Sequence, residues 1–382
     1  MSSAHEPYHI RLRKYCRFLF KQVSIYYKRN WWHKLIIIFV LLILIIFIAM
    51  ASIGEWYISS QSDIPLTYGV SFIPDYASSL GLNPKQTMLA LLNIGVRQFR
   101  LTSYWSDIEP VKNQFNYSEL DWEMSLANQY KAKVILTVGL RQPRWPECHP
   151  PAWVNTSAPM STWEPQLLSF MRNVINRYKN NPALEAWQLE NEYFLKGFGT
   201  CTNFSRSRLN SEFNLLKKLD PTHPVIIGRS NNALGIPLGS PTPDFYGISI
   251  YKRVWDAAVT HRYLEYPYPG WFYAFLAGLQ QIHQGKNMII DELQGEAWPP
   301  NGKSITQTSL AEQNKSLSAT RLQNRFNFGK STGMKDIILW GAEYWYYRKE
   351  ILHDPSLWNV AANEFKNNHY HSGVYLLSHP NL

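Results

Sequence analysis

The chain has 382 residues, of which 45% are hydrophobic and 15% aromatic, enough for one large domain or two smaller ones. Seven of its ten net positive charges fall in the first 34 residues, which hold eight Lys or Arg and one acid, Glu6. The rest of the chain is close to neutral. This distribution argues against a nucleic-acid-binding face and against a basic membrane-surface protein.

An uninterrupted apolar stretch follows the basic segment. Residues 35–53 read LIIIFVLLILIIFIAMASI, a run of 19 residues without a charge. As a helix rising ~1.5 Å per residue it would span roughly 28 Å, close to the hydrocarbon thickness of a bilayer. Trp31 and Trp32 precede it and Trp56 follows it, where aromatic rings favour the membrane interfaces. We expect a single-pass anchor. A cleaved leader is the alternative, but its apolar core is usually shorter.

Short apolar runs then alternate with longer amphipathic ones. The runs read as strands buried on both faces and lie at 67–72, 96–101, 133–139, 185–190, 224–228, 246–251, 287–292 and 336–341. Helical spacing is clearest at 83–95, 161–181 and 316–331, whereas the Gly- and Pro-rich stretch 229–245 holds at best a short helix. Eight such units predict an α/β fold, a (β/α)₈ TIM barrel. An open doubly wound sheet is the alternative, but no Gly-rich phosphate loop supports it.

These patterns predict five parts of the chain. They are a basic cytoplasmic segment, a transmembrane helix, a linker, a barrel domain and a C-terminal tail, at residues 1–34, 35–54, 55–66, 67–366 and 367–382. Because positive residues flank the cytoplasmic side of a span, we expect the N-terminus inside and the barrel outside the cytoplasmic membrane.

Functional side chains of a (β/α)₈ barrel follow its strands. Here those segments are acidic, aromatic and amide-rich, which suits a neutral polyhydroxyl ligand. Glu192 and Glu292 close the fourth and seventh strands. Cleavage of a glycosidic bond needs two facing carboxyl groups, one a protonated acid and the other an ionised nucleophile or base. Glu190, which strict alternation puts on the same face as Glu192, is a rival, as are Asp291 and Glu296.

Three motifs resemble a known group of enzymes. AWQLENEYF at 186–194 is similar to the strand-four motif of glycoside hydrolase clan A, and MIIDELQGEAW at 288–298 is similar to its strand-seven motif. Residues 96–139 are similar to its passage from strand two to strand three. Over roughly residues 67–365 the chain therefore resembles clan A, nearest to the family 35 and 42 β-galactosidases and their cellulase-like relatives.

The resemblance implies roles for individual residues. Glu192 would be the acid/base and Glu292 the nucleophile of a retaining mechanism, with carboxyl groups ~5–5.5 Å apart. Asn191 would bind the 2-hydroxyl of the sugar at the cleavage point. Arg100 and Tyr251 would hold the nucleophile and keep it ionised.

The resemblance also implies aromatic contacts with the sugar. Trp340 would form the floor under the sugar, and Trp105 and Trp298 are further candidates for substrate binding. The resemblance does not identify the sugar. The segment RQPRWPECHPPAW at 141–153 matches no substrate-defining motif, and the His that some cellulase-like relatives carry directly before the tyrosine is absent before Tyr251.

Metal and cofactor signals are weak. Eleven His are scattered without H-E-x-x-H or zinc-ligand spacing, so we expect neither a metal nor a cofactor. Cys148 and Cys201 follow the third and fourth strands, whose loops are neighbours in a barrel. We expect them to form a disulfide across the rim; two separate thiols are the alternative.

The expected function is that of a membrane-anchored retaining glycoside hydrolase that cleaves β-linked oligo- or polysaccharides outside the membrane. The alternative is a catalytically inactive barrel that binds extracellular carbohydrate, since fold alone does not determine activity. The paired Glu192 and Glu292 favour the enzyme, because a binding protein does not need both.

Overall fold

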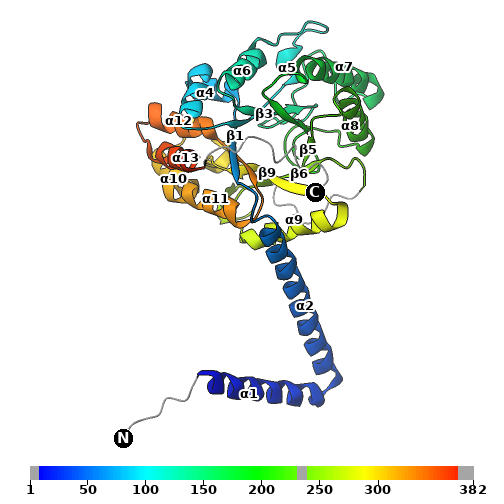
Figure 1. The fold of residues 1–382 in the computed structure, drawn as a ribbon, viewed down its shortest axis with the longest axis vertical. Helices are drawn as coiled ribbons and strands as arrows, with labels where there is room; N and C mark the ends of the chain where they lie inside the picture. The colour runs from blue at the N-terminus through cyan, green and yellow to red at the C-terminus, as the bar shows by residue number, and fades with distance from the viewer. Residues whose placement is uncertain (1–7, 230–238, 369–382) are drawn as a thin grey trace. The chain divides into compact units, whose positions relative to one another are not determined.

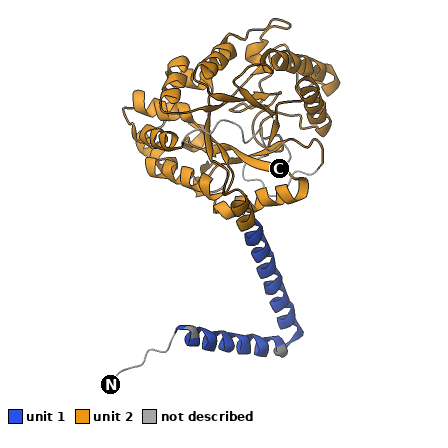
Figure 2. Cartoon of the chain, in the orientation of Figure 1, with its two compact units in different colours: residues 1–53 blue, residues 54–382 orange. Residues whose placement is uncertain are grey.

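The structure, a computed structural model, describes residues 8–229 and 239–368 (Figure 1). The chain divides into two compact units, residues 1–53 and 54–382 (Figure 2). Most of the Gly- and Pro-rich stretch after the fifth strand, and the expected tail from residue 369, lie outside the described residues.

Two helices begin the described chain, α1 (Tyr8–Arg29) and α2 (Trp31–Ser60). Helix α2 has the length and composition of a membrane span, with a mean hydropathy of 3.4 over its most apolar window. It continues six residues past the expected end of the span, so the first half of the expected linker is helical. Tyr57 is 1% exposed and belongs to the main apolar core. Gly54 permits this packing, because a Cβ there would lie 2.8 Å from the Trp271 carbonyl oxygen.

Eight parallel strands close into a barrel, which confirms the predicted fold class. Around the barrel the order is β1-β10-β9-β6-β5-β4-β3-β2. The strands are β1 (Thr67–Ser71), β2 (Gln98–Leu101), β3 (Lys133–Val138), β4 (Leu184–Leu189), β5 (Val225–Arg229), β6 (Phe245–Ile250), β9 (Asn287–Gln294) and β10 (Asp336–Trp340). Each coincides with one of the eight predicted runs to within two residues at either end.

Helices surround the barrel and pack on the outer side chains of the strands. They are α3 (Pro74–Ser79), α4 (Pro84–Asn93), α5 (Trp105–Ile108), α6 (Ser118–Gln129), α7 (Met160–Tyr178), α8 (Arg206–Leu219), α9 (Gly270–Gln284), α11 (Ala319–Ser331), α12 (Ala342–Glu350) and α13 (Ser356–Asn367). Asn83 caps α4, its side-chain oxygen accepting from the Gln86 N–H at 3.0 Å, as its position before Pro84 predicts.

Alternate residues of the strands form two apolar layers. The outward-facing ones join the helices in one large core. The inward-facing ones form a separate cluster, to which six different strands contribute Ile135, Ala186, Ile226, Phe245, Ile289 and Ile338. The barrel interior is therefore packed, and ligands have access only to its ends.

Two insertions extend the face at the C-terminal ends of the strands. A two-stranded antiparallel hairpin, β7 (Arg253–Asp256) and β8 (Arg262–Glu265), follows β6. The segment after β9 contains η1 (Pro300–Gly302), η2 (Ile305–Gln307) and α10 (Leu310–Ser316). The hairpin was not among the predicted strands, because its residues carry charges rather than an apolar alternation.

Strand β9 carries an irregularity at its functional end. Gly247 pairs with Ile289, whereas Ser249 pairs with Glu292, so β9 has one extra residue opposite β6. Such a bulge re-aims the side chains around it. Asp291 turns toward β6, and a Cβ on Gly247 would lie 2.0 Å from its carboxyl oxygen. Glu292 turns toward the C-terminal face.

A buried ion pair fixes the end of β4. Glu190 accepts hydrogen bonds from the backbone N–H groups of Leu140 at 2.6 Å and Arg141 at 3.1 Å. Its charge is balanced by Arg208 of α8, whose Nη1 lies 2.8 Å from the Glu190 carboxylate. Arg208 also contacts Glu212 one turn further along α8. The network joins the β3 loop, the β4 end and α8.

We expect Arg208→Gln to lower the free energy of unfolding by about 3–5 kcal/mol, because it leaves buried carboxylates without a counter-charge. Urea unfolding of the purified chain, followed by tryptophan fluorescence, measures the loss. The matched control is Arg177→Gln, whose partner Asp121 forms an ion pair with both side chains over 40% exposed, so its loss should stay below ~1 kcal/mol. Equal losses would contradict the assigned role of the Arg208 network.

A disulfide joins two loops on the C-terminal face. Cys148, in the loop after β3, is bonded to Cys201, in the loop after β4. The third cysteine, Cys16, is free and exposed. Within the loop after β3, the backbone of Arg141 forms an isolated antiparallel β-bridge with the backbone of Cys148. The loop after β3 is thus fastened both to itself and to its neighbour.

Cys201→Ser should lower the free energy of unfolding by about 2–4 kcal/mol under oxidising conditions, since it frees a closed loop in the unfolded chain. Cys16→Ser is the control and should leave the urea midpoint unchanged. Reducing agent should lower the wild-type midpoint to that of Cys201→Ser; a wild-type midpoint insensitive to reduction would refute the expectation.

Candidate active site

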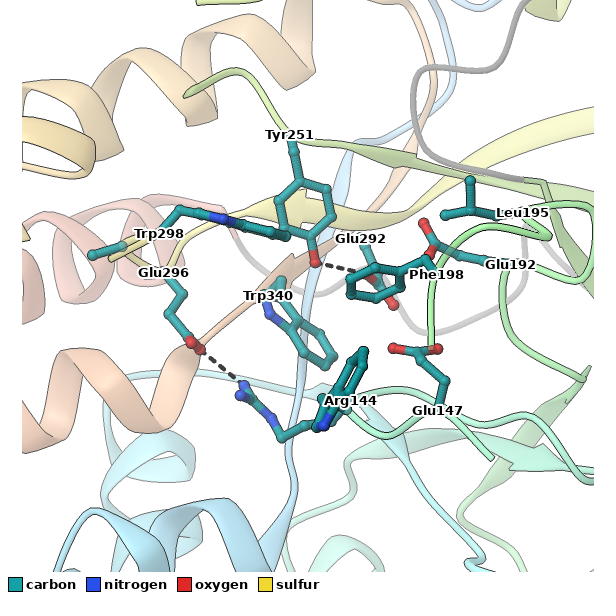
Figure 3. A pocket seen from close by; sticks show the side chains of 12 residues that line it. Arg144, Glu147, Glu192, Leu195, Phe198, Tyr251, Glu292, Glu296, Trp298 and Trp340 are labelled. Carbon is teal, nitrogen blue, oxygen red and sulfur yellow. Dashed lines mark hydrogen bonds and ion pairs between the residues drawn. The ribbon is translucent and has the colours of Figure 1, made fainter. Parts of the chain in front are cut away.

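A cavity of about 270 Å³ opens at the C-terminal ends of the strands (Figure 3). Carboxylates and aromatic rings dominate its walls. Among the described residues it is lined by Arg144, Trp145, Glu147, Glu192, Leu195, Phe198, Tyr251, Glu292, Glu296, Ala297, Trp298 and Trp340. Both predicted catalytic carboxyl groups are in this set, although they lie 100 residues apart in the chain.

Glu292 is held from two sides. Arg100 of β2 donates from Nη1 to one carboxylate oxygen at 2.8 Å, and the Tyr251 hydroxyl donates to the other at 2.8 Å. Glu292 is 3% exposed and Arg100 is 1% exposed, so water screens this ion pair poorly. A carboxylate with both oxygens accepting from fixed donors is oriented as a nucleophile must be.

Glu192 has the opposite environment. It lines the same cavity and is 4% exposed, with no cation in hydrogen-bonding contact among the described residues. Burial, followed by the negative charges of Glu292 and Glu147, raises the pKa of Glu192 well above its ordinary value. The two carboxyl groups of the cavity therefore differ, because Glu292 is paired with a cation whereas the pKa of Glu192 is raised.

Glu190 and Asp291, two of the alternatives to Glu192 and Glu292, do not line the cavity, and the third, Glu296, lines it but is paired with Arg144. Strand β4 ends at Leu189, and Glu190 and Glu192 adopt left-handed backbone angles, with φ of 58° and 40°. The expectation that strict alternation puts both on one face is therefore wrong, and Glu190 pairs with Arg208 outside the cavity. Asp291 does not line the cavity, and burial raises its pKa to about 7.

Asn191 lies just behind the cavity wall and is 1% exposed. Its side-chain oxygen accepts from Arg100 Nη2 at 2.6 Å. Its side-chain nitrogen donates to Glu147 at 3.1 Å. The Asn191 side chain therefore connects Arg100, the cation that is paired with Glu292, to the carboxyl group of Glu147.

The aromatic candidates divide into two groups. Trp340 and Trp298 line the cavity, and the Trp298 ring meets Tyr251 edge-on at 5.6 Å between centroids. Trp105, expected to bind substrate, does not line it. Its indole is fully buried and donates to Glu109 at 2.8 Å, because the short helix α5 turns it into the apolar core.

Two charged residues that line the cavity, Arg144 and Glu147, were not predicted from the sequence. Glu147, in the β3 loop beside Cys148, is 3% exposed, and burial, reinforced by the Glu292 charge, raises its pKa to about 7. Arg144 of the same loop forms an ion pair with Glu296 at 2.8 Å. Figure 3 shows this pair across Trp340 from Glu192 and Glu292. The unusual 141–153 segment was the available signal, but nothing in it indicated which side chains turn inward.

The Arg144 guanidinium stacks between two rings. It lies 3.3 Å from the Tyr76 ring centroid and 4.6 Å from that of Trp340. Arg144 also donates a hydrogen bond to Glu296, so a donor and an acceptor group lie side by side in the cavity wall. This arrangement suits the hydroxyl groups of a sugar, which both donate and accept. No cluster of His, Cys, Asp or Glu suited to a metal ion occurs within residues 8–229 and 239–368.

Comparison with known proteins gives short sequence matches and long structural ones. No protein-family model matches the chain. It is 27% identical over 121 residues to mannan endo-1,4-beta-mannosidase F of Aspergillus fumigatus, covering 30% of this chain and 26% of that one. It is 32% identical over 81 residues to the probable mannan endo-1,4-beta-mannosidase F of Aspergillus flavus, covering 21% and 17%. The match thus spans about a quarter or less of these curated relatives.

Two solved structures extend the comparison to the fold. A GH5_18 protein of Bifidobacterium longum, in complex with Manb1-4GlcNAc, aligns with a TM-score of 0.53, 11% identity and coverage of 80% of this chain and 79% of that one. A GH10 endoxylanase from a sugarcane soil metagenome aligns with a TM-score of 0.52, 14% identity and coverage of 81% and 99%. The closed parallel barrel and these matches show a fold shared with a GH5_18 protein and a GH10 endoxylanase.

Proposed function

We propose that the protein is a retaining glycoside hydrolase of β-linked glycans that uses Glu292 as nucleophile and Glu192 as acid/base. The observation that carries this proposal is the contrast between two carboxyl groups of one cavity. Glu292 contacts Arg100 and Tyr251, whereas burial and like charges raise the pKa of Glu192. A retaining mechanism needs one ionised and one protonated carboxyl group on opposite sides of the sugar.

The proposed reaction has two steps. Glu292 attacks the anomeric carbon while Glu192 gives its proton to the leaving oxygen, and a glycosyl ester of Glu292 forms. Glu192, now ionised, then takes a proton from water, which attacks the anomeric carbon and releases Glu292. Arg100 and Tyr251 orient Glu292 throughout, Asn191 supports Arg100 and Glu147 from behind the cavity wall, and Trp340 supplies an apolar floor.

The substrate and location are also proposals. The curated relatives are named mannan endo-1,4-beta-mannosidases, which supports a β-linked polysaccharide, of mannan type or similar. The apolar helix α2 and the basic residues before it support a single-pass anchor with its N-terminus in the cytoplasm. The barrel would then act on glycans outside the cytoplasmic membrane.

Replacing each carboxyl group should separate the two roles. On a panel of aryl β-glycosides, Glu292→Gln should lower kcat/KM by roughly 10³-fold or more, because no nucleophile remains. Glu192→Gln should lower it by roughly 10²–10⁴-fold for poor leaving groups and much less for dinitrophenyl glycosides, which need little protonation. The control is Glu350→Gln, an exposed carboxylate paired with Lys349.

The same assay tests the alternative. Wild-type turnover of no glycoside or mannan, combined with binding of glycans on an array, would favour the inactive carbohydrate-binding barrel. Turnover that survives Glu292→Gln would refute the assigned nucleophile.

The pH dependence should report the protonated acid. Because Glu192 must carry a proton and its pKa is raised, the alkaline limb of kcat/KM should lie above the ordinary pH range of a glutamic acid. Glu147→Gln removes a negative charge that helps to raise it, so the alkaline limb should move to lower pH. A pH–rate profile of wild type beside Glu147→Gln and Glu350→Gln measures the shift. An alkaline limb that stays in place in Glu147→Gln would contradict the proposed electrostatic coupling.

A further inference from the structure

A second hollow lies on the same face as the catalytic cavity. It has a volume of about 780 Å³ and lies between the β7–β8 hairpin and the segment 300–315. Both flanking elements are insertions after the C-terminal ends of barrel strands, where substrate-binding loops are found. The two hollows are close along the chain, since Trp298 lines the cavity and Pro300 lines the groove.

The groove carries an excess of positive charge. Arg253, Arg262, Lys303 and Lys315 line it, against the single carboxylate of Glu312. Glu312 is already occupied by Lys315 at 2.6 Å and by the Tyr263 hydroxyl at 3.0 Å. In the part of the chain that the structure describes, neither Arg262 nor Lys303 forms an ion pair.

Aromatic rings form part of the groove wall. Trp255 and Tyr263 meet edge-on at 5.2 Å between centroids, and the Arg253 guanidinium lies 5.2 Å from the Tyr263 ring. The indole N–H of Trp255 is buried and has no acceptor among the described residues. Flat apolar surface beside cations suits a chain of sugar rings with acidic substituents.

The catalytic cavity has no such excess of positive charge. Glu147, Glu192, Glu292 and Glu296 line it, against one cation, Arg144, which is paired with Glu296. An acidic sugar would meet no unpaired cation there, because Arg144 is paired with Glu296 and Arg100 is paired with Glu292. The two hollows therefore differ in the charge of the sugar that each would suit.

We propose that the basic groove binds acidic residues of a mixed polysaccharide whose uncharged residue occupies the catalytic cavity. The proposal rests on the proposed glycosidase function and adds the substrate class, a β-glycan that carries carboxylate or sulfate groups. The groove cations hold the acidic part through charge-assisted hydrogen bonds, and the aromatic pair packs against the sugar rings.

Affinity electrophoresis of the full chain in detergent tests the groove. The background is Glu292→Gln, so that turnover does not consume the probe, and the probes are polygalacturonate, dextran sulfate and neutral galactomannan. We expect the acidic probes to retard the protein and added salt, on the order of 0.5 M, to weaken this binding. Arg262→Gln with Lys303→Gln should raise the dissociation constant for the acidic probe at least tenfold. Thermal unfolding of each variant confirms that it is folded.

The matched control removes the same charge from the opposite end of the barrel. Lys131 and Lys366 are exposed and line a different hollow at the N-terminal ends of the strands. Lys131→Gln with Lys366→Gln should leave acidic-glycan binding intact. Equal weakening in both double variants, or no binding of either acidic probe, would overturn the proposal. Retardation by one acidic probe alone identifies carboxylate or sulfate as the ligand.

The proposed activity is tested independently by wild-type hydrolysis of aryl β-glycosides, which are too small to reach the groove. Failure of that hydrolysis with groove-dependent binding would reject the glycosidase and keep the acidic-glycan site. Hydrolysis without acidic-glycan binding would do the reverse.

Discussion

The buried contact between Arg100 and Glu292 organises the candidate active site. Removing a guanidinium and a carboxylate from water costs several kcal/mol per ion, and the attraction offsets this only when the remaining donors are satisfied. The Arg100 donors are satisfied from several strands. Besides Glu292 at 2.8 Å, they contact Gln188 at 2.7 Å, Asn191 at 2.6 Å, Ser71 at 3.2 Å and the Asp291 carbonyl at 3.2 Å. The guanidinium thus sets the relative positions of β1, β2, β4 and β9.

The loops of the site adopt costly backbone conformations. Four non-glycine residues there have positive φ, namely Arg144 at 82°, Glu147 at 71°, Glu190 at 58° and Glu192 at 40°. Each such conformation costs on the order of 1 kcal/mol and persists only when its surroundings enforce it. The Cys148–Cys201 disulfide and the Glu190–Arg208 ion pair supply that constraint. As a result, the carboxyl groups of Glu147 and Glu192, which regular strand geometry would not bring together, face one small cavity.

Positive and negative charges are distributed unevenly among the parts of the protein. The N-terminal segment holds most of the net positive charge, the cavity is rich in carboxyl groups, and the groove between the hairpin and the segment 300–315 is basic. Local charge, rather than the overall value of +10, therefore describes what each surface attracts. Inside the cavity the same principle acts at short range, where burial and then the neighbouring charges of Glu292 and Glu147 raise the pKa of Glu192.

The sequence by itself determined the barrel and the position of its chemistry. Apolar runs at regular intervals identify eight strands, and parallel strands put Glu192, Glu292, Arg100 and Tyr251 at one face whatever the details of packing. Apolar length likewise identifies α2 as a candidate span.

Only the tertiary structure decided which side chains reach the cavity. A bulge in β9 and left-handed residues after β4 break the alternation on which sequence patterns rely, so the direction of Glu190 could not be predicted. Trp105 turned into the core, while Arg144 and Glu147 were brought inward by a loop fastened far along the chain at Cys201. These outcomes depend on contacts between segments distant in sequence, and local periodicity carries no information about such contacts.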